Sequence, residues 1–263
     1  MFLDSLFTFK ISQMQLSKLN LQDIQNNQFE LAVLPWGATE AHNFHLPYGT
    51  DNLQNSVIIN QASQMANEHG AKVVVLPEIP FGVNTGQSDI PYVINMLPST
   101  QQAIVKDVAT SVFKQCDKLL IFNGHGGNDF KTIIRELGVL FPNKKILTCN
   151  WFQALEASKY FSQPGDHADE VETSLMQYLY PELVRPLSEA GNGQSKLFKV
   201  KALNQSWAWA EREWTKVSND TGVGNPAKSS AEKGERFFKD VCQVISQFII
   251  ELAKAPLSEF YSY

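Results

Sequence analysis

Residues 31–42 read LAVLPWGATEAH, and residues 118–128 read KLLIFNGHGGN. Each stretch begins as a short aliphatic run and ends in glycines and polar side chains. The runs KVVVLP at 72–77 and KILTC at 145–149 have a similar composition. Short aliphatic runs without alternation are typical of strands buried on both faces, as in parallel sheets. We therefore predict buried strands at Leu31–Pro35, Lys72–Pro77, Lys118–Asn123 and Lys145–Cys149.

Helical periodicity fills the intervals between these runs. Asp51–Glu68 places apolar residues at helical spacing, and Gln101–Cys116 and Asp129–Phe141 repeat the pattern. A last long helix is expected at Ser229–Ala253. Strands that alternate with helices predict an α/β fold with a mostly parallel sheet covered on both sides. In such sheets the active groups gather beyond the carboxyl ends of the strands.

The composition narrows the class of protein. The chain has 263 residues, of which 43% are hydrophobic and 19% charged, which is typical of a folded globular protein. We find no internal repeat and no linker, so we expect one domain over residues 1–263. The net charge of −5 disfavours a nucleic-acid partner. The apolar runs are shorter than the ~18 residues that span a bilayer, which disfavours a membrane partner.

The cysteines and the N-terminus indicate a cytoplasmic protein. The chain starts MFLDSLFTFKISQM, with an early acidic residue and no cleavage site after a continuous apolar stretch, so we expect no signal peptide. Cys116, Cys149 and Cys242 are widely spaced and form no CxxC pair. They fit reduced thiols better than a disulfide framework.

Candidate metal ligands follow the first and third predicted strands. Glu40 and His42 are two apart, so an extended backbone points both side chains the same way. Asp51 opens the next helix, and His125 lies in a glycine-rich loop. Carboxylates and imidazoles suit divalent zinc, manganese or iron. No lysine follows the glycines as a phosphate-binding P-loop would require.

The stretch DHADEVETS, residues 166–174, indicates the start of a helix that runs to Leu179. On that helix His167 and Glu170 would share a face at i, i+3, and Glu172 would not. Taken alone, Asp166 could simply cap the helix and Glu170 could be a solvated carboxylate. However, four of the five histidines fall in these three motifs, and the combination predicts a metal site. His45 is the fourth histidine of these motifs, and it could equally be an ordinary loop histidine without a role in metal binding.

These motifs resemble those of the creatininase family. GATEAHNFHLPYGTD, NGHGGN and HADEVETS are similar to its three motifs, and TGVGNP with AEKG near the C-terminus is similar to its closing segment. The resemblance implies a three-layer α/β/α sandwich and a metal-dependent amidohydrolase with two divalent ions. The metals implied are Zn, Mn or both, with Fe as a further option. It also implies a homo-oligomer, often a hexamer.

By the same resemblance, Glu40, Asp51 and His125 would bind one ion, and His42 with the bridging Asp51 would bind the other. In creatininase a glutamate two positions after the histidine of NGH completes the second site. That position is Gly127 here, so Glu170 is expected to substitute, and creatinine itself is disfavoured as substrate. Asp169 stands where the family has glycine. It could raise the pKa of His167, favour a cationic substrate or point to solvent.

The implied reaction starts with a water held between the two metals. It attacks an amide carbonyl, and His167 gives a proton to the leaving nitrogen. We expect Glu172 and Thr173 to orient the helix. Side chains and glycines expected in catalysis, substrate binding or the pocket wall are His167, Glu170, Trp151, Gly126, Gly127, Asn128, Glu78, Asn84 and Gln87. The tryptophans 207, 209 and 214 form either a packing or subunit face or a lid over a flat heterocycle.

The leading functional hypothesis is hydrolysis of a non-peptide C–N bond in a small amide: a cyclic amide, a lactam or a formamide. One alternative is a formamide deformylase acting on a pyrimidine precursor, for which Lys131 and Arg135 are candidate phosphate contacts. Another is a peptidase of a modified peptide. A metal-binding protein without turnover is the least favoured.

Overall fold

The computed structural model describes residues 14–205 and 207–261. The N-terminal stretch on which the signal-peptide prediction rests lies outside the described residues. The central sheet has the order β2-β1-β3-β4, and every neighbouring pair is parallel. Its strands are β1 (Leu31–Trp36), β2 (Val73–Val75), β3 (Lys118–Asn123) and β4 (Lys145–Asn150). All four predicted strands are present, with ends displaced by no more than two residues.

The helices follow the predicted alternation. They are α2 (Leu21–Gln25), α3 (Thr50–Glu68), α4 (Pro98–Val112), α5 (Phe130–Leu140), α6 (Glu170–Leu179), α7 (Lys201–Asn204), α8 (Trp214–Val217) and α9 (Ala231–Lys254). The short 3-10 helices include η2 (Thr85–Gln87) and η3 (Trp151–Gln153). The helices predicted at 51–68, 101–116, 129–141 and 229–253 correspond to α3, α4, α5 and α9.

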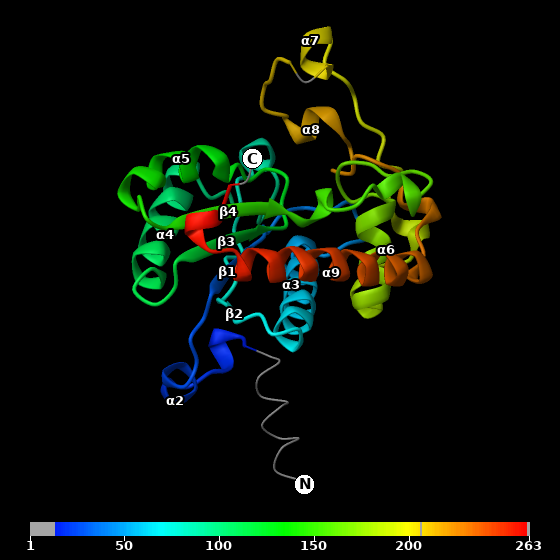
Figure 1. Ribbon diagram of the computed structural model, residues 1–263. Coiled ribbons are helices and arrows are strands. Elements are labelled where there is room, and N and C mark those ends of the chain that lie inside the picture. The colour runs from blue at the N-terminus through cyan, green and yellow to red at the C-terminus, as the bar shows by residue number, and fades with distance from the viewer. Residues whose placement is uncertain (1–13, 206, 262–263) are drawn as a thin grey trace.

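Two hydrophobic clusters lie on opposite faces of the sheet. Alternate residues of β1 point to different clusters, Val33 to one and Leu34 to the other. The first cluster is covered by α3 and α9 with part of α6, and the second by α4 and α5 (Figure 1). The observed architecture is the predicted three-layer α/β/α sandwich.

One strand differs from its prediction. Residues of β4 are only partly buried along the whole strand, whereas β1, β2 and β3 are buried throughout. β4 is an edge strand, so only one neighbour covers its backbone. The opposite edge, β2, is better covered because Val75 donates its N–H to the Met14 carbonyl at 2.9 Å.

The strand order places the site. The chain leaves β1 to one side for β2 and then crosses to β3 on the other side. In parallel sheets such a reversal marks the usual place of a ligand site, here the carboxyl ends of β1 and β3, where Trp36 and Asn123 are paired in register. The segments that carry Glu40, His42 and His125 begin there. The predicted candidate ligands therefore start from adjacent strand ends.

A long loop, called the excursion, projects from the sandwich near the carboxyl ends of the strands. Residues 196–217 leave and return at a bridge between Ser195 and Ser218, and they carry α7 and α8. Figure 1 shows both short helices projecting beyond the sandwich, with α8 the nearer to it. Leu197, Trp207 and Trp209 are largely exposed on the excursion. Within the described residues, no helix is long and apolar enough to cross a membrane.

Candidate metal centre

The predicted ligands from β1, α3 and β3 meet in a buried cluster. Asp51 lies in the first turn of α3. Its Oδ1 is 3.1 Å from His42 Nε2, and its Oδ2 is 3.0 Å from His125 Nδ1. His125 Nδ1 also lies 2.8 Å from Glu40 Oε1. All four side chains are buried, so water does not screen these charges.

Each cluster histidine places one ring nitrogen on a backbone carbonyl. His42 Nδ1 contacts the Glu40 carbonyl at 3.2 Å, and His125 Nε2 contacts that of Val83 at 3.0 Å. His167 Nε2 contacts the Ala41 carbonyl at 2.8 Å. A carbonyl oxygen only accepts, so the ring nitrogen on it carries the proton. The other ring nitrogen is left with a lone pair that faces carboxylates, as in histidines that bind metals.

This donor set fits a divalent cation. A lone pair on His125 Nδ1 facing two carboxylate oxygens is stable only with a positive charge among them. Asp51 Oδ2 is buried and has no hydrogen-bond partner among the described residues. Neutral imidazole and carboxylate ligands are the preferred set for zinc, manganese and iron.

The electrostatics show the same excess of carboxylate. Burial by itself lowers the pKa of His42, but Asp51, Glu172 and Glu40 outweigh it and raise that pKa to about 10. The pKa of His125 is likewise raised well above its usual value, against burial, by Glu40 and Asp51. Burial raises the pKa of Asp51, yet the two histidines hold it well below its ordinary range. The cluster therefore favours positive charge at its centre.

The third motif brings Glu172, and not Glu170, to the cluster. Glu172 Oε2 is 3.8 Å from His42 Nε2 and accepts the Ala168 N–H at 2.6 Å. Burial raises its pKa to about 8 against the opposing charge of His42. Glu170 is turned away, paired with Lys233 Nζ and accepting the Gln163 N–H at 2.6 Å. The expected placement of Glu170 in the metal site is therefore corrected.

The physical reason is the start of the helix. α6 begins at Glu170, so His167 precedes it and the predicted shared face at i, i+3 does not exist. Asp169 is the N-cap, and its Oδ1 accepts the N–H groups of Val171 and Glu172. An acidic cap followed three residues later by glutamate is a known signal for a helix start, and it could have placed this boundary. Asp169 is buried in this cap, so its side chain does not point to solvent.

Two groups of three ligands share one residue. Glu40, Asp51 and His125 offer ligand atoms that lie within 4.8 Å of one another, and so do His42, Asp51 and Glu172. A third such group joins Glu40 and His42 to His167. Among the described residues, Glu170 belongs to none of these groups.

His167 lies at the rim of the cluster. The closing segment holds it through a bridge in which Val223 N–H donates to the His167 carbonyl at 2.8 Å. Its ring stands 4.2 Å from that of His42 and 4.8 Å from that of Trp214, centroid to centroid. Burial, reinforced by the charge of His42, lowers the pKa of His167. The imidazole is therefore neutral near pH 7.

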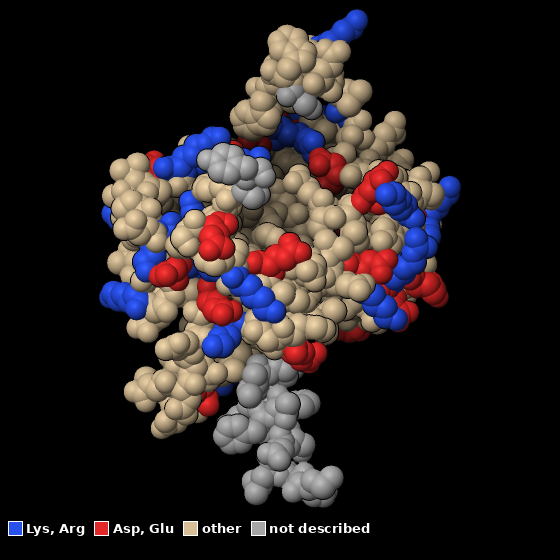
Figure 2. Space-filling model, viewed as in Figure 1, with Lys and Arg blue, Asp and Glu red and all other residues tan. Residues whose placement is uncertain are grey.

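The excursion covers the site through α8. Trp214 packs edge-on against His167, and the Arg212 guanidinium lies over the Trp214 ring at 4.8 Å and pairs with Asp166 at 2.7 Å. Thr215 Oγ1 donates to Asp89 Oδ2 at 2.6 Å. Of the three tryptophans, only Trp214 touches a cluster residue in the described chain, while 207 and 209 are exposed. Figure 2 shows a hollow beneath the excursion with acidic and basic side chains around it.

The residues expected to bind substrate differ in environment. Gly126 is exposed, and a Cβ there would meet nothing within 4 Å in the described part of the chain. A Cβ at Gly127 would overlap the Val83 carbonyl and the His125 ring, so a creatininase-like glutamate does not fit this backbone. Both polar atoms of the Asn128 side-chain amide are hydrogen-bonded within the protein: Oδ1 accepts from the Val83 N–H and Gln101 Nε2, and Nδ2 donates to Asn123 Oδ1.

Further candidates lie outside the cluster. Trp151 is buried in η3 within the first hydrophobic cluster, and its Nε1 has no partner among residues 14–205 and 207–261. Glu78 accepts from Asn55 and Ser56. Asn84 donates to the Ile94 carbonyl. The candidate phosphate contacts 131 and 135 lie exposed on α5.

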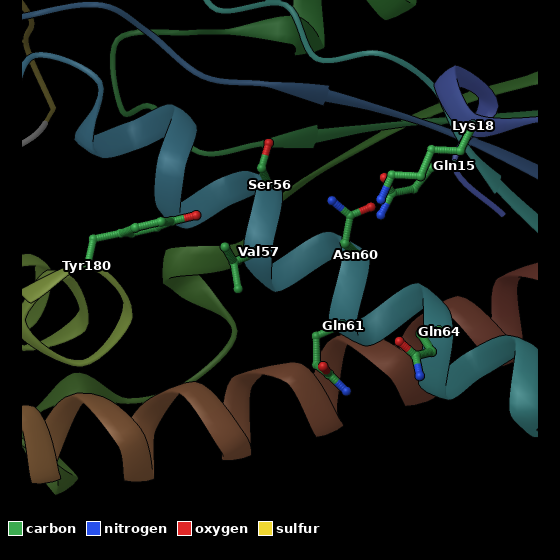
Figure 3. A pocket seen from close by; sticks show the side chains of 8 residues that line it. All are labelled: Gln15, Lys18, Ser56, Val57, Asn60, Gln61, Gln64 and Tyr180. Atoms are coloured by element: carbon green, nitrogen blue, oxygen red, sulfur yellow. The ribbon is translucent and has the colours of Figure 1, made fainter. Parts of the chain in front are cut away.

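A separate cavity of about 330 Å³ opens on α3 (Figure 3). It is lined by Gln15, Lys18, Ser56, Val57, Asn60, Gln61, Gln64 and Tyr180. These lining residues include no histidine and no carboxylate. The cavity therefore lacks the groups of a hydrolytic site, and the chemistry is assigned to the buried cluster.

Comparison with known proteins identifies the family. The family model described as creatinine amidohydrolase matches residues 15–249. The mycofactocin precursor peptide peptidase of Mycolicibacterium smegmatis is 22% identical over 215 residues, covering 80% of this chain and 81% of that protein. The 3-dehydro-scyllo-inosose hydrolase of Thermotoga maritima is 29% identical over 175 residues, 60% of this chain and 52% of that protein.

Solved structures agree as well. A Bacteroides fragilis protein, provisionally assigned as a creatinine amidohydrolase, is 41% identical with a TM-score of 0.87, covering 95% of this chain and 99% of its own. A creatininase variant complexed with creatine shares the fold at 20% identity and a TM-score of 0.77, covering 92% of this chain and 100% of that one. Other creatininase structures are described as Zn–Zn and Mn forms. The predicted family and enzyme class are thus confirmed: the chain belongs to the creatininase family of amidohydrolases.

Proposed function

We propose that this protein is a two-metal hydrolase of a C–N bond in a small, non-peptide amide. The observation that carries the proposal is the position of Asp51 between two histidines. One of its oxygens is 3.1 Å from His42 Nε2 and the other 3.0 Å from His125 Nδ1. A carboxylate shared in this way is the usual bridge of a two-metal site.

Each ion would have three protein ligands. Glu40, Asp51 and His125 would hold the first, and His42, Asp51 and Glu172 the second. Zn or Mn is proposed because both occur in creatininase structures and suit these ligands, with Fe as a further option. When bound, such ions supply Lewis-acid chemistry that activates water and stabilises negative charge on a carbonyl oxygen.

His167 is proposed as the group that moves the proton. Its Nε2 is held by the Ala41 carbonyl, so Nδ1 faces the cluster, 3.9 Å from Glu40 Oε1. A neutral ring can take up the proton lost by the attacking water and deliver it to the leaving amine nitrogen. Trp214 packs against this ring and shields it from bulk water.

The covered site favours a small substrate. α8 lies over the cluster, and the Trp214 ring offers an aromatic wall next to His167. A cyclic amide, lactam or formamide is flat and compact enough for such a site. Gly126 is proposed as a place of close approach for the substrate, because it is exposed and has no side chain.

A peptidase acting on a modified peptide is the second candidate. Its support is the name of the mycofactocin precursor peptide peptidase, which aligns over 80% of this chain. The exposed Trp207 and Trp209 on the excursion offer apolar surface that a peptide could contact outside the cluster. The formamide deformylase has less support, since Lys131 and Arg135 lie exposed on α5.

The experiment is a substrate panel with the metal-free protein reloaded with Zn or Mn. The panel contains creatinine, lactams, formylaminopyrimidines and short peptides. We expect metal-dependent turnover of a small amide, reduced at least ~100-fold in His167→Ala with metal content unchanged. Faster turnover of a peptide would favour the peptidase. Full metal occupancy with no turnover on any member would overturn the proposed function.

We also propose a cytoplasmic homo-oligomer. Cys116, Cys149 and Cys242 are free thiols, as expected in a reducing compartment. The exposed apolar side chains of the excursion offer area for subunit contact. Light scattering of the purified protein measures the assembly, and a monomer at all concentrations would refute it.

A further inference from the structure

We propose that Gln87 is a positioning residue that fixes the carboxylate of Glu40 for metal binding. The inference rests on the proposed function, because it assigns Glu40 to the first ion. Gln87 is 1% exposed and lies at the end of η2, far from Glu40 in sequence. Its side-chain amide reaches the segment after β1 and contacts two consecutive residues there, Glu40 and Ala41.

The two contacts define the orientation of the amide. The backbone N–H of Ala41 is a donor, so the atom 3.1 Å from it must be Oε1 of Gln87. The amide nitrogen then faces Glu40 Oε2, which accepts a short hydrogen bond from Nε2. A flipped amide would place a donor on a donor and an acceptor on a carboxylate. The neighbours therefore permit only one orientation.

The two oxygens of the Glu40 carboxylate have different partners. Oε2 is occupied by Gln87, while Oε1 lies 2.8 Å from His125 Nδ1 and 3.9 Å from His167 Nδ1. A carboxylate held at one oxygen cannot rotate freely, so the other oxygen remains directed into the cluster. Ligands that are held by a hydrogen bond bind metal more tightly because less conformational freedom is lost on binding.

The turn that carries Gln87 is itself held in place. Asn84, which precedes η2, donates from its side chain to the Ile94 carbonyl at 3.0 Å and accepts the Gln87 N–H on its own carbonyl at 2.9 Å. A Cβ on Gly86 would overlap the Arg212 carbonyl, so the excursion is seated directly on this turn. Gln87 is therefore pre-organised from both sides before any ion binds.

The test measures metal affinity in Gln87→Met and Gln87→Glu. Methionine keeps the length of the side chain and removes the donor, and glutamate places an acceptor against Glu40. We expect a loss of about 10–100-fold in the affinity for one ion, the range found when such supporting bonds are removed. The measurement is a competition titration of the metal-free protein against a chelator, with Zn and with Mn.

Gln101→Met is the matched control. Gln101 is also a fully buried glutamine, and its Nε2 donates to Asn128 Oδ1 at 2.8 Å, which is not one of the proposed ligands. Both methionine variants remove one buried donor, and Gln87→Met also removes the acceptor of the Ala41 N–H, so its loss of melting temperature should be the larger. Only the Gln87 variants should lose metal affinity. Equal affinity in Gln87→Met and Gln101→Met would overturn the inference.

A measurement in a second variant, Glu172→Gln, identifies which of the two ions Gln87 affects. In Glu172→Gln the ion held by His42 and Asp51 is weakened, so the remaining tight site contains Glu40. Adding Gln87→Met should then weaken that remaining site by the same 10–100-fold. An unchanged remaining site would contradict the positioning role. If the unmodified protein binds no metal at all, the proposed function fails, an outcome separate from either result.

Discussion

Two glutamates of one helix have opposite roles. Glu170 and Glu172 are two positions apart, and α-helix geometry points them about 200° away from each other. Glu170 turns to Lys233 and joins α6 to α9, whereas Glu172 faces His42. One residue supports the packing of two helices, and the other supplies a carboxylate to the cluster.

Replacing Glu170 or Glu172 with glutamine should separate helix packing from metal binding. We expect Glu172→Gln to lose one of two bound ions, because a neutral amide is a poor ligand for a divalent metal. Glu170→Gln should keep both ions and lose about 1–3 kcal/mol of unfolding free energy, since it leaves the Lys233 charge with a weaker partner. Elemental analysis and urea unfolding measure the two effects. Loss of an ion in Glu170→Gln instead would restore the original expectation for that residue.

Most members of the buried cluster were predictable from the sequence, but Glu172 was not. Glu40, His42, Asp51 and His125 follow strand ends or begin a helix, and the parallel sheet brings such positions together. The choice between Glu170 and Glu172 depends on where α6 starts, which the buried Asp169 cap decides. A boundary shift of a few residues rotates the helix face, so helical spacing alone favoured Glu170, which the structure turns away from the cluster.

His45 introduces a pH dependence of stability. Its Nε2 pairs with Thr173 Oγ1 at 2.8 Å, and its Nδ1 is buried with no partner in the described chain. Burial, with the charge of His42, lowers its pKa from 6.5 to about 4. The unfolded chain therefore takes up a proton below pH 6.5 that the folded chain refuses until about pH 4.

The contribution of neutral His45 to the free energy of unfolding is therefore fully present above pH 6.5, and it is lost as the pH falls toward 4. The loss should reach about 3 kcal/mol. His45→Gln keeps a donor for Thr173 and has no proton to gain, so its stability should fall less over the same range. Chemical unfolding at pH 7 and pH 4.5 measures the difference. Parallel pH curves for the two proteins would contradict this account.

At the scale of elements, short aliphatic runs were the best guide. β3 matches its prediction at both ends, and β1 and β4 each extend one residue further. β4 differs in burial, because strand order decides which strand is an edge, and the sequence of one strand does not contain that order. The excursion at 196–217 was not predicted as a unit, since α7 and α8 are only four residues each.

A buried lysine closes the longest helix. Lys118 Nζ donates to the carbonyl oxygens of Leu252 at 2.7 Å, Ala253 at 2.6 Å and Ala255 at 2.8 Å. These carbonyls lie at the C-terminal end of α9, where intrahelical partners run out. The first residue of β3 is thereby tied to the end of α9.

Removing this ammonium group should destabilise the protein. Lys118→Met leaves buried carbonyls unpaired, which should cost about 3 kcal/mol or more of unfolding free energy. Lys145→Met is the control, because Lys145 pairs in register with Lys118 at the start of β4 but is only partly buried. Its loss should stay below about 1 kcal/mol. Equal losses in the two variants would refute the capping role.

At the scale of the whole molecule, the sandwich brings segments from different parts of the chain together in the buried cluster. The proposed ligands come from three stretches far apart in sequence: residues 40–51 between β1 and the start of α3, the loop after β3, and α6. The closing segment, through Val223, holds His167, and the excursion covers it with Trp214. The family motifs coincide with these segments, each of which is proposed to supply one part of a single site.

The central claim is a pair of divalent ions that share Asp51. The most direct test is the metal content of the protein purified without chelator and titrated with Zn or Mn. We predict two tightly bound ions per chain, and no more than one in Asp51→Asn, with the fold retained by circular dichroism. A single ion in the unmodified protein, or two in Asp51→Asn, would contradict the claim.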